Sequence, residues 1–201
     1  MPPKAIELLE RARAGDREAL GELLSVFRNY LTLLAKLQIG RRLQGKADAS
    51  DLVQETYVDA HRDFPQFRGG TEGELVSWLR EIMARNLADL VRRFQGAQRR
   101  DVRLERRLAQ ELDQTSRLLD RGLVAREKSP SQEVAHREQS VLLADAIEGL
   151  PPDYNQVIVL RHFDGQTFPE IARQMGRSLD SVEKLWVRAL VRLRKALGEV
   201  E

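Results

Sequence analysis

Apolar residues recur at helical spacing along nearly all of this 201-residue chain, and this repeat limits the fold more than any other feature. The repeat is clearest over residues 72–94, where apolar positions lie mostly three or four apart and so share one face of an α-helix. Leu, Ala, Glu and Arg are common, whereas runs of β-branched residues are scarce. Because this composition favours helix over strand, the sequence predicts an all-α protein.

Two further helices are expected before this one. The first covers residues 16–38, begins at the capping residue Asp16 and ends near Gly40. The second covers residues 49–63, with Ser50 as its N-cap. Both carry apolar residues at helical spacing, so each is expected to bury one face.

The helix over 72–94 is expected to follow a break at the Gly69–Gly70 pair and to be capped by Thr71. Trp78 falls within its apolar stripe, so we predict a packing role for this side chain. The full stripe comprises Leu75, Trp78, Leu79, Ile82, Met83, Leu87, Leu90 and Val91.

The helices group into two small domains, residues 1–96 and 138–201, joined by a charged linker over 97–137. The linker is rich in Arg, Glu and Gln and poor in aromatic residues, so we expect transient or partner-dependent helix there. Three leucines of this segment could line one helix face: Leu104, Leu108 and Leu112.

The composition excludes several classes of protein. The chain has no cysteine, which rules out a disulfide scaffold and a cysteine nucleophile. Its three histidines have no ligand spacing, and no phosphate-binding glycine loop is present, so we predict no metal site, no cofactor and no enzyme activity. The longest apolar stretch, residues 31–39, is too short to span a bilayer, and we expect a cytoplasmic protein without a membrane span.

Charge is distributed in blocks although the net charge is only +2. Residues 48–74 carry seven acidic side chains against two arginines, which favours a basic partner. Residues 80–107 carry nine arginines against four acids, and residues 173–195 carry seven basic side chains against two acids. Two basic blocks, each on an amphipathic helix, indicate two contacts with a polyanion.

The second basic block belongs to a helix-turn-helix pattern over residues 167–197. Thr167 and Glu170 form a capping-box pair, and Gly176 stands where a left-handed C-cap residue is needed. Ser178 can cap the second helix. The buried stripe of that helix is expected to contain Val182, Leu185, Trp186, Ala189, Leu190, Leu193 and Leu197.

The opposite face of this second helix has the chemistry of a DNA-reading surface, since one helix fits the major groove. Lys184 and Ser181 can reach phosphates or base edges, and Arg188 can pair with guanine or contact the backbone. Glu183 can accept from a cytosine amino group, and Val187 can contact a thymine methyl. The predicted DNA-binding set is Arg177, Ser181, Glu183, Lys184, Val187 and Arg188.

Two longer stretches resemble a known family. The sequences SDLVQETYVDAHRDFPQFRG and LVSWLREIMARNLADLVRR resemble region 2 of bacterial RNA polymerase sigma factors. The sequence IEGLPPDYNQVIVLRHFDGQTFPEIARQMGRSLDSVEKLWVRALVRLRKAL resembles region 4. Both regions occur in the family's order with only a linker between them, the layout of the extracytoplasmic-function (ECF) group. The resemblance implies a region 2 helical bundle, a region 4 helix-turn-helix, and a subunit that gives core RNA polymerase its promoter specificity.

The resemblance also assigns roles to residues. The helix over 51–59 is implied to dock on the clamp helices of the polymerase β′ subunit, and the β subunit is implied as a second contact. On this helix, the residues implied to contact the polymerase are Asp51, Leu52, Gln54, Glu55 and Asp59. Recognition and melting of the −10 element would use Arg68, Arg80, Arg85, Asn86, Arg92 and Arg93. The helix-turn-helix would read the −35 element of promoter DNA.

Two other functions compete with this interpretation. A stand-alone helix-turn-helix regulator accounts for residues 167–197 but leaves the region 2-like segment without a role. A metal-dependent nuclease would have to use the acids at Asp48, Asp51, Glu55 and Asp59. The promoter sequence, the activating signal and control by an anti-sigma factor all stay open at this point.

Overall fold

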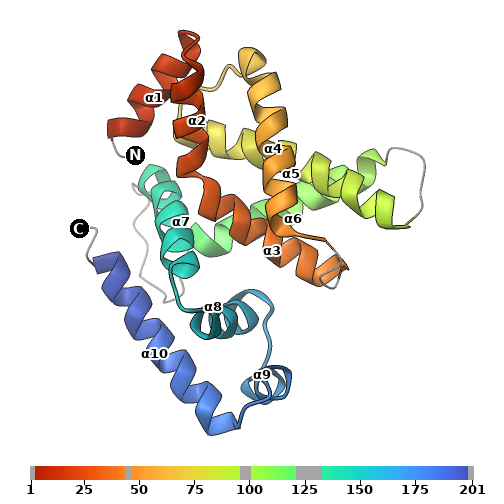
Figure 1. Cartoon of the computed structure of the whole chain (residues 1–201), viewed down its shortest axis with the longest axis vertical. Helices are drawn as coiled ribbons and strands as arrows, with labels where there is room; N and C mark the ends of the chain where they lie inside the picture. The colour runs from red at the N-terminus through yellow and green to blue at the C-terminus, as the bar shows by residue number, and fades with distance from the viewer. Residues whose placement is uncertain (1–2, 44–46, 96–100, 121–132, 199–201) are drawn as a thin grey trace.

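The computed structural model describes residues 3–43, 47–95, 101–120 and 133–198, and within them it contains helices and no strand (Figure 1). The all-α prediction is confirmed. The elements are α1 (Pro3–Arg13), α2 (Arg17–Val26), α3 (Arg28–Leu43), α4 (Ala49–Asp63), η1 (Phe64–Gln66), α5 (Glu72–Gln95), α6 (Val102–Asp120), α7 (Glu133–Glu148), α8 (Pro152–Ile158), the π-helical turn η3 (Val159–Phe163), α9 (Phe168–Met175) and α10 (Leu179–Gly198).

The helix expected over residues 16–38 is two helices, α2 and α3, separated at Phe27. The backbone of Phe27 leaves helical geometry (φ −95°, ψ 5°), and its side chain is fully buried. Burial of this ring favours a break that the local apolar repeat does not reveal. The predicted end near Gly40 is also wrong, because α3 continues to Leu43. The cost of a helical glycine, about 1 kcal/mol relative to alanine, is small beside the packing energy of α3.

Local capping fixes where several helices begin. Asp16 caps α2 by accepting from the amide of Ala19 at 3.0 Å, as predicted. The N-cap of α4 is Asp48 and not Ser50, because the Asp48 carboxylate accepts from the Ser50 amide at 2.8 Å. A carboxylate at this position also faces the positive end of the helix dipole, which a serine hydroxyl exploits less well.

Helices α1 to α5 form a bundle around a continuous apolar core (Figure 1). The longest helix, α5, packs against α4, α6 and α3. Its side chains at Leu75, Leu79 and Leu87 are completely buried, as its apolar stripe predicts. Trp78 is partly buried and packs against this core, in agreement with the packing role predicted for it.

Helix α6 lies within the segment expected to be a linker, yet it is packed along α5. Leu108, Leu112 and Leu119 are completely buried, and Leu104 is 9% exposed. The leucine face noted in the sequence therefore belongs to the bundle core. The proposed boundary at residues 96–97 lies outside the described residues.

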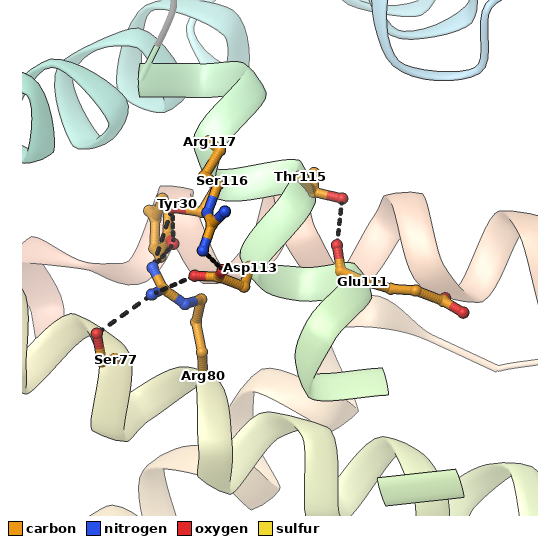
Figure 2. Close-up of polar contacts among 8 residues, drawn as sticks. All are labelled: Tyr30, Ser77, Arg80, Glu111, Asp113, Thr115, Ser116 and Arg117. Carbon is orange, nitrogen blue, oxygen red and sulfur yellow. Dashed lines mark hydrogen bonds and ion pairs between the residues drawn. The ribbon is translucent and has the colours of Figure 1, made fainter. Parts of the chain in front are cut away.

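A largely buried arginine, Arg80, connects α6 to the bundle (Figure 2). One terminal nitrogen of Arg80 on α5 donates to the hydroxyls of Tyr30 on α3 and Ser116 on α6, both at 3.0 Å. Its other terminal nitrogen donates to Asp113 at 3.1 Å and to Ser77 at 3.2 Å. The Arg80 side chain is only 15% exposed, so these bonds form largely away from water.

The C-terminal helices form a smaller group, α8 to α10, with α7 between this group and the bundle. Helix α7 contacts α3 and α6 of the bundle as well as α10 and α8. No helix within the described residues has the length and apolar character needed to cross a membrane.

We predict that Leu112→Ala lowers the free energy of unfolding by about 2–5 kcal/mol, because it leaves a cavity where α6 meets α5. The matched control on the same helix is Leu118→Ala, whose side chain is 44% exposed and should cost less than about 0.5 kcal/mol. Urea denaturation followed by circular dichroism measures both. Equal effects would show that α6 is not part of the core.

Candidate protein- and DNA-contact surfaces

The acidic face of α4 forms as its residue spacing predicts. Asp51, Gln54 and Glu55 are exposed, and Asp59 is half-buried. Leu52, which the resemblance assigns to the contact residues, belongs to the buried core and is 1% exposed, and it also lines the groove beside this face. Helical geometry explains the difference, since Leu52 lies one position from Asp51 and so about 100° away around the helix.

An open groove runs beside this acidic face, between the start of α4 and the end of α5, with a volume of about 380 Å³. Asp51 and Glu55 form one wall, and Arg93 and Phe94 form the other. Phe94 is 49% exposed, which is unusual for a large aromatic side chain. The groove therefore combines carboxylates with an accessible apolar surface.

Arg93 crosses this groove and pairs with Glu55, with its terminal nitrogen 3.2 Å from each carboxylate oxygen. Both side chains are about half-exposed, so the pair contributes little to stability. It does connect a residue predicted to contact protein with a residue predicted to contact DNA.

The loop before α5 is built on an aromatic cluster. The rings of Phe64, Phe67 and Trp78 lie 4.9–6.2 Å apart, centroid to centroid. Gly69 passes so close to Phe67 that a Cβ atom at this position would lie 2.5 Å from the ring. The Thr71 hydroxyl accepts from the amide of Glu74 at 3.3 Å, and the Glu74 carboxylate accepts from the amide of Thr71 at 3.0 Å, which confirms Thr71 as the cap of α5.

The residues predicted to contact the −10 element separate into surface and interior groups. Arg68 is exposed, and its guanidinium donates to the Pro65 carbonyl at 3.1 Å. Arg85 is 41% exposed and pairs with Asp63 at 3.3 Å, and Arg93 is 59% exposed. These three side chains are on the surface that a nucleic acid could reach.

The other three predicted −10 residues are largely inside. Arg80 belongs to the network of Figure 2, and Arg92 is 18% exposed and pairs with Asp89 on its own helix. Asn86 is 7% exposed, and its amide nitrogen has no hydrogen-bond partner among the described residues. The structure therefore does not gather the six residues on one face.

The helix-turn-helix forms as its caps predict. Thr167 and Glu170 make both bonds of the capping box, and Gly176 adopts the left-handed conformation (φ 62°, ψ 34°) that ends α9. The hydroxyl of Ser178 accepts from the amide of Ser181 at 3.3 Å at the start of α10. Val182, Ala189 and Leu193 of α10 are buried, as the apolar stripe of this helix predicts.

The predicted DNA-reading face of α10 points outward. Glu183, Lys184 and Arg188 are exposed, and Val187 is 51% exposed. The smaller Ser181 is half-buried beside them. Arg177, in the turn, is exposed and pairs with Asp153 of α8. Val187 thus lies exposed among charged side chains on this face.

One interaction beneath α10 was not predicted. The Trp186 indole donates from Nε1 to Nε2 of His162 at 3.0 Å, and the two rings are stacked. Phe168 packs edge-on against the same indole. Burial and the neighbouring charge of Arg161 lower the pKa of His162, which matches its role as a neutral acceptor. The sequence gives no sign of this pair, because its members lie 24 positions apart.

No group of three or more metal-type ligands occurs among the described residues. Of the four acids considered above as nuclease ligands, Asp51, Glu55 and Asp59 lie on α4 and Asp48 is its N-cap.

Comparison with known proteins gives a consistent family. The family model for ECF sigma factors matches residues 3–199. The chain is 31% identical to the ECF RNA polymerase sigma factor BldN of Streptomyces coelicolor, over 98% of this chain and 67% of that protein. It is 30% identical to the ECF RNA polymerase sigma-E factor of Haemophilus influenzae, over 90% of this chain and 89% of that protein. The RsbN–BldN complex is a similar solved structure, at 23% identity and a TM-score of 0.31, with 93% of this chain and 97% of that chain covered.

We predict that the C-terminal helices lose stability as pH falls through the ordinary pKa of histidine, near 6.5. The folded His162 has a lowered pKa, so below pH 6.5 the unfolded state binds the proton more readily and is favoured. The loss should level off once the pH is below the folded pKa. Thermal melts between pH 5 and 8 measure it.

The matched control is His162→Gln, which retains an acceptor for Trp186 but does not titrate. The difference in melting temperature between wild type and this variant should shrink or change sign towards low pH. A difference that is the same at pH 5 and pH 8 would contradict the prediction.

Proposed function

Since this chain belongs to the ECF sigma factor family, we propose that it docks on core RNA polymerase through α4 and reads promoter DNA with the surfaces of α5 and α10. Its function as a sigma factor is to direct transcription initiation. The observation that supports it best is the exposed carboxylate face of α4, which stands beside the groove formed with α5.

The docking surface consists of Asp51, Gln54, Glu55 and Asp59, with Phe94 as an apolar anchor across the groove. Carboxylates on an exposed helix face attract a basic partner over long range, while a half-exposed aromatic supplies contact area. The occupant that fits is the coiled coil of the β′ clamp helices. Leu52 is left out of this surface, because its burial gives it a role in the core.

The −10 surface is reduced to Arg68, Arg85 and Arg93, the exposed members of the set predicted from the sequence. Each can approach a phosphate once its present partner is displaced, and charged contacts of this kind position the protein on DNA. Arg80, Asn86 and Arg92 support α5 from inside the bundle in this proposal.

The −35 surface is the outer face of α10 together with Arg177. Lys184 and Arg188 supply cations at positions four apart, which lie on the same side of a helix. Glu183 and Val187 occupy the same face and provide contacts to a cytosine amino group and a thymine methyl. Such a surface gives base preference as well as affinity.

We keep three functional segments as part of the proposal. Residues 1–96 contain the polymerase-docking surface and the −10 surface, and residues 138–201 contain the −35 surface. Residues 97–137 link these two segments. The chain acts in the cytoplasm without a catalytic step of its own, because the polymerase supplies the chemistry.

We predict that Asp51→Arg/Glu55→Arg prevents co-migration of the chain with core RNA polymerase on size exclusion, because two attractive charges become repulsive. The matched control is Glu18→Arg on α2, another exposed acid, which should leave co-migration unchanged. If the wild type never joined core polymerase but bound duplex DNA alone, a stand-alone helix-turn-helix regulator would be the better assignment.

We predict that Arg188→Ala relaxes base preference at one position of the −35 element. A lost bidentate contact to guanine costs about 1–3 kcal/mol of discrimination. The measurement is sequencing of DNA selected by the polymerase holoenzyme from a library randomised over this element. Arg194→Ala, further along the same helix, should weaken binding evenly across sequences, and an even loss for Arg188→Ala as well would assign that residue to the phosphate backbone.

A further inference from the structure

Helix α10 packs against α8 and α9, and Trp186 is one of its anchoring side chains (Figure 1). The indole is partly buried against the core, directly before Val187 and Arg188 of the predicted DNA-reading face. All side chains of a helix turn together, so a rotation of α10 that moves the indole moves Val187 and Arg188 by the same angle. The position of the Trp186 ring therefore decides how the reading face is presented.

Two ring contacts and one hydrogen bond hold the Trp186 indole. Phe168 of α9 packs edge-on against it, with 5.4 Å between the ring centroids. His162 of η3 is stacked on it at an interplanar angle of 17° and accepts from the indole nitrogen at 3.0 Å. Ring contacts tolerate sliding, whereas a hydrogen bond between two ring nitrogens is directional and fixes one point of the indole. His162 is therefore the contact that sets the position of the indole.

The π-helical turn η3 supports both neighbours of this indole. It carries His162, which contacts Trp186 directly, and Arg161, which lies over the Phe168 ring at 4.8 Å from its centroid. Arg161 also donates to the backbone carbonyl of Gln166 at 2.9 Å, so the loop that follows the turn is fixed as well. Turns of this geometry are rare and occur frequently at functional sites.

The hydrogen bond from Trp186 requires a neutral imidazole. An indole N–H can only donate, and a protonated imidazole carries a hydrogen on both nitrogens, so it has no acceptor to offer. In the neutral ring the hydrogen belongs on Nδ1, because Nε2 accepts. Protonation of His162 would thus leave two donors facing each other and would break the contact that fixes the indole.

The surroundings of His162 do not compensate a positive charge. Among the described residues, Arg161 is the charged neighbour that acts on His162, and it repels a proton. Asp164, at the end of η3, is exposed. The charged or titratable groups on the helices packed around η3 pair with other side chains or are exposed: Asp153 with Arg177, Tyr154 with Arg192, Glu170 with Thr167, Lys184 with Asp180, and the exposed Arg173, Glu183 and Arg188.

We propose that His162 is a positioning residue for promoter reading: the neutral imidazole holds Trp186 and so sets the orientation of α10, and protonation of the imidazole releases the indole and weakens preference for the −35 sequence. The reading of the −35 element by α10 rests on the proposed function, whereas the hold of His162 on Trp186 concerns the chain alone. Acidification then reduces sequence preference at the −35 element and leaves preference at the −10 element unchanged.

The first measurement follows the indole N–H signals of the free chain by nuclear magnetic resonance between about pH 7.5 and about pH 5.5, where ordinary carboxylates stay ionised. The chain has two tryptophans, and Trp186→Phe identifies the signal of Trp186. This signal should shift as pH falls, with a midpoint below about 6.5. The Trp78 signal is an internal control, because its ring neighbours Phe64 and Phe67 do not titrate.

His162→Gln retains an acceptor but does not titrate, so its Trp186 signal should stay constant over this range. The other two histidines titrate in both proteins, and the difference between them therefore isolates His162. A Trp186 signal that shifts equally in wild type and His162→Gln would overturn the hold of His162 on the indole. Circular dichroism at each pH shows that the helices remain folded.

The second measurement sequences DNA that the polymerase holoenzyme selects from a library randomised over the −35 element. For the wild type, preference for the selected sequence should fall about two- to tenfold between about pH 7.5 and about pH 5.5, the effect of losing one hydrogen bond. His162→Gln should keep its preference at both pH values. His162→Phe, which keeps a stacked ring without an acceptor, should show the weaker preference at both.

A parallel library randomised over the −10 element separates this effect from a general loss of polymerase function, since preference there should be the same in all three proteins at each pH. A wild-type preference at −35 that falls no further than that of His162→Gln would overturn the role in promoter reading. If the wild type forms no holoenzyme, the proposed function fails and the promoter role of His162 with it, while the indole signals still decide whether His162 holds Trp186.

Discussion

Burial of α5 is the constraint on which the rest of the structure depends. This helix is covered by α4, α3 and α6, and its leucines at 75, 79 and 87 have no exposed surface. A helix packed on several sides cannot turn to present another face, because interiors are close-packed and every rotation would open voids. The direction of each polar side chain on α5 is therefore fixed by the apolar ones.

That fixed direction sorts the arginines of α5 into two kinds. Arg80 points inward, where Asp113, Tyr30 and Ser116 satisfy its donors and draw α6 onto the bundle. Arg93 points outward and reaches Glu55 on the acidic face of α4. A single basic block in the sequence thus serves both cohesion and surface charge, and only burial distinguishes the two roles.

The same arrangement links the contact surfaces of the molecule. The groove beside α4 has Glu55 on one side and Arg93 on the other, and the two side chains pair across it. Helix α7 adds a second link, because it touches both the bundle and α10.

The sequence by itself determined the features that depend on near neighbours in the chain. The all-helical fold, the capping box at Thr167 and Glu170, the left-handed turn at Gly176 and the outward face of α10 all follow from residues within a few positions of one another. Helix periodicity also found the acids of α4, although it could not tell that Leu52 belongs to the core.

Only the tertiary structure decided which elements meet. The inward turn of Arg80, the packing of α6 and the pairing of Trp186 with His162 all involve partners distant in sequence, and the break at Phe27 accompanies full burial of its ring. Local patterns carry no information on such partners. The same arginine can face solvent, another helix or a ligand, and the same row of leucines can pack on any of several helices. The choice is made by burial, which exists only once the chain has folded.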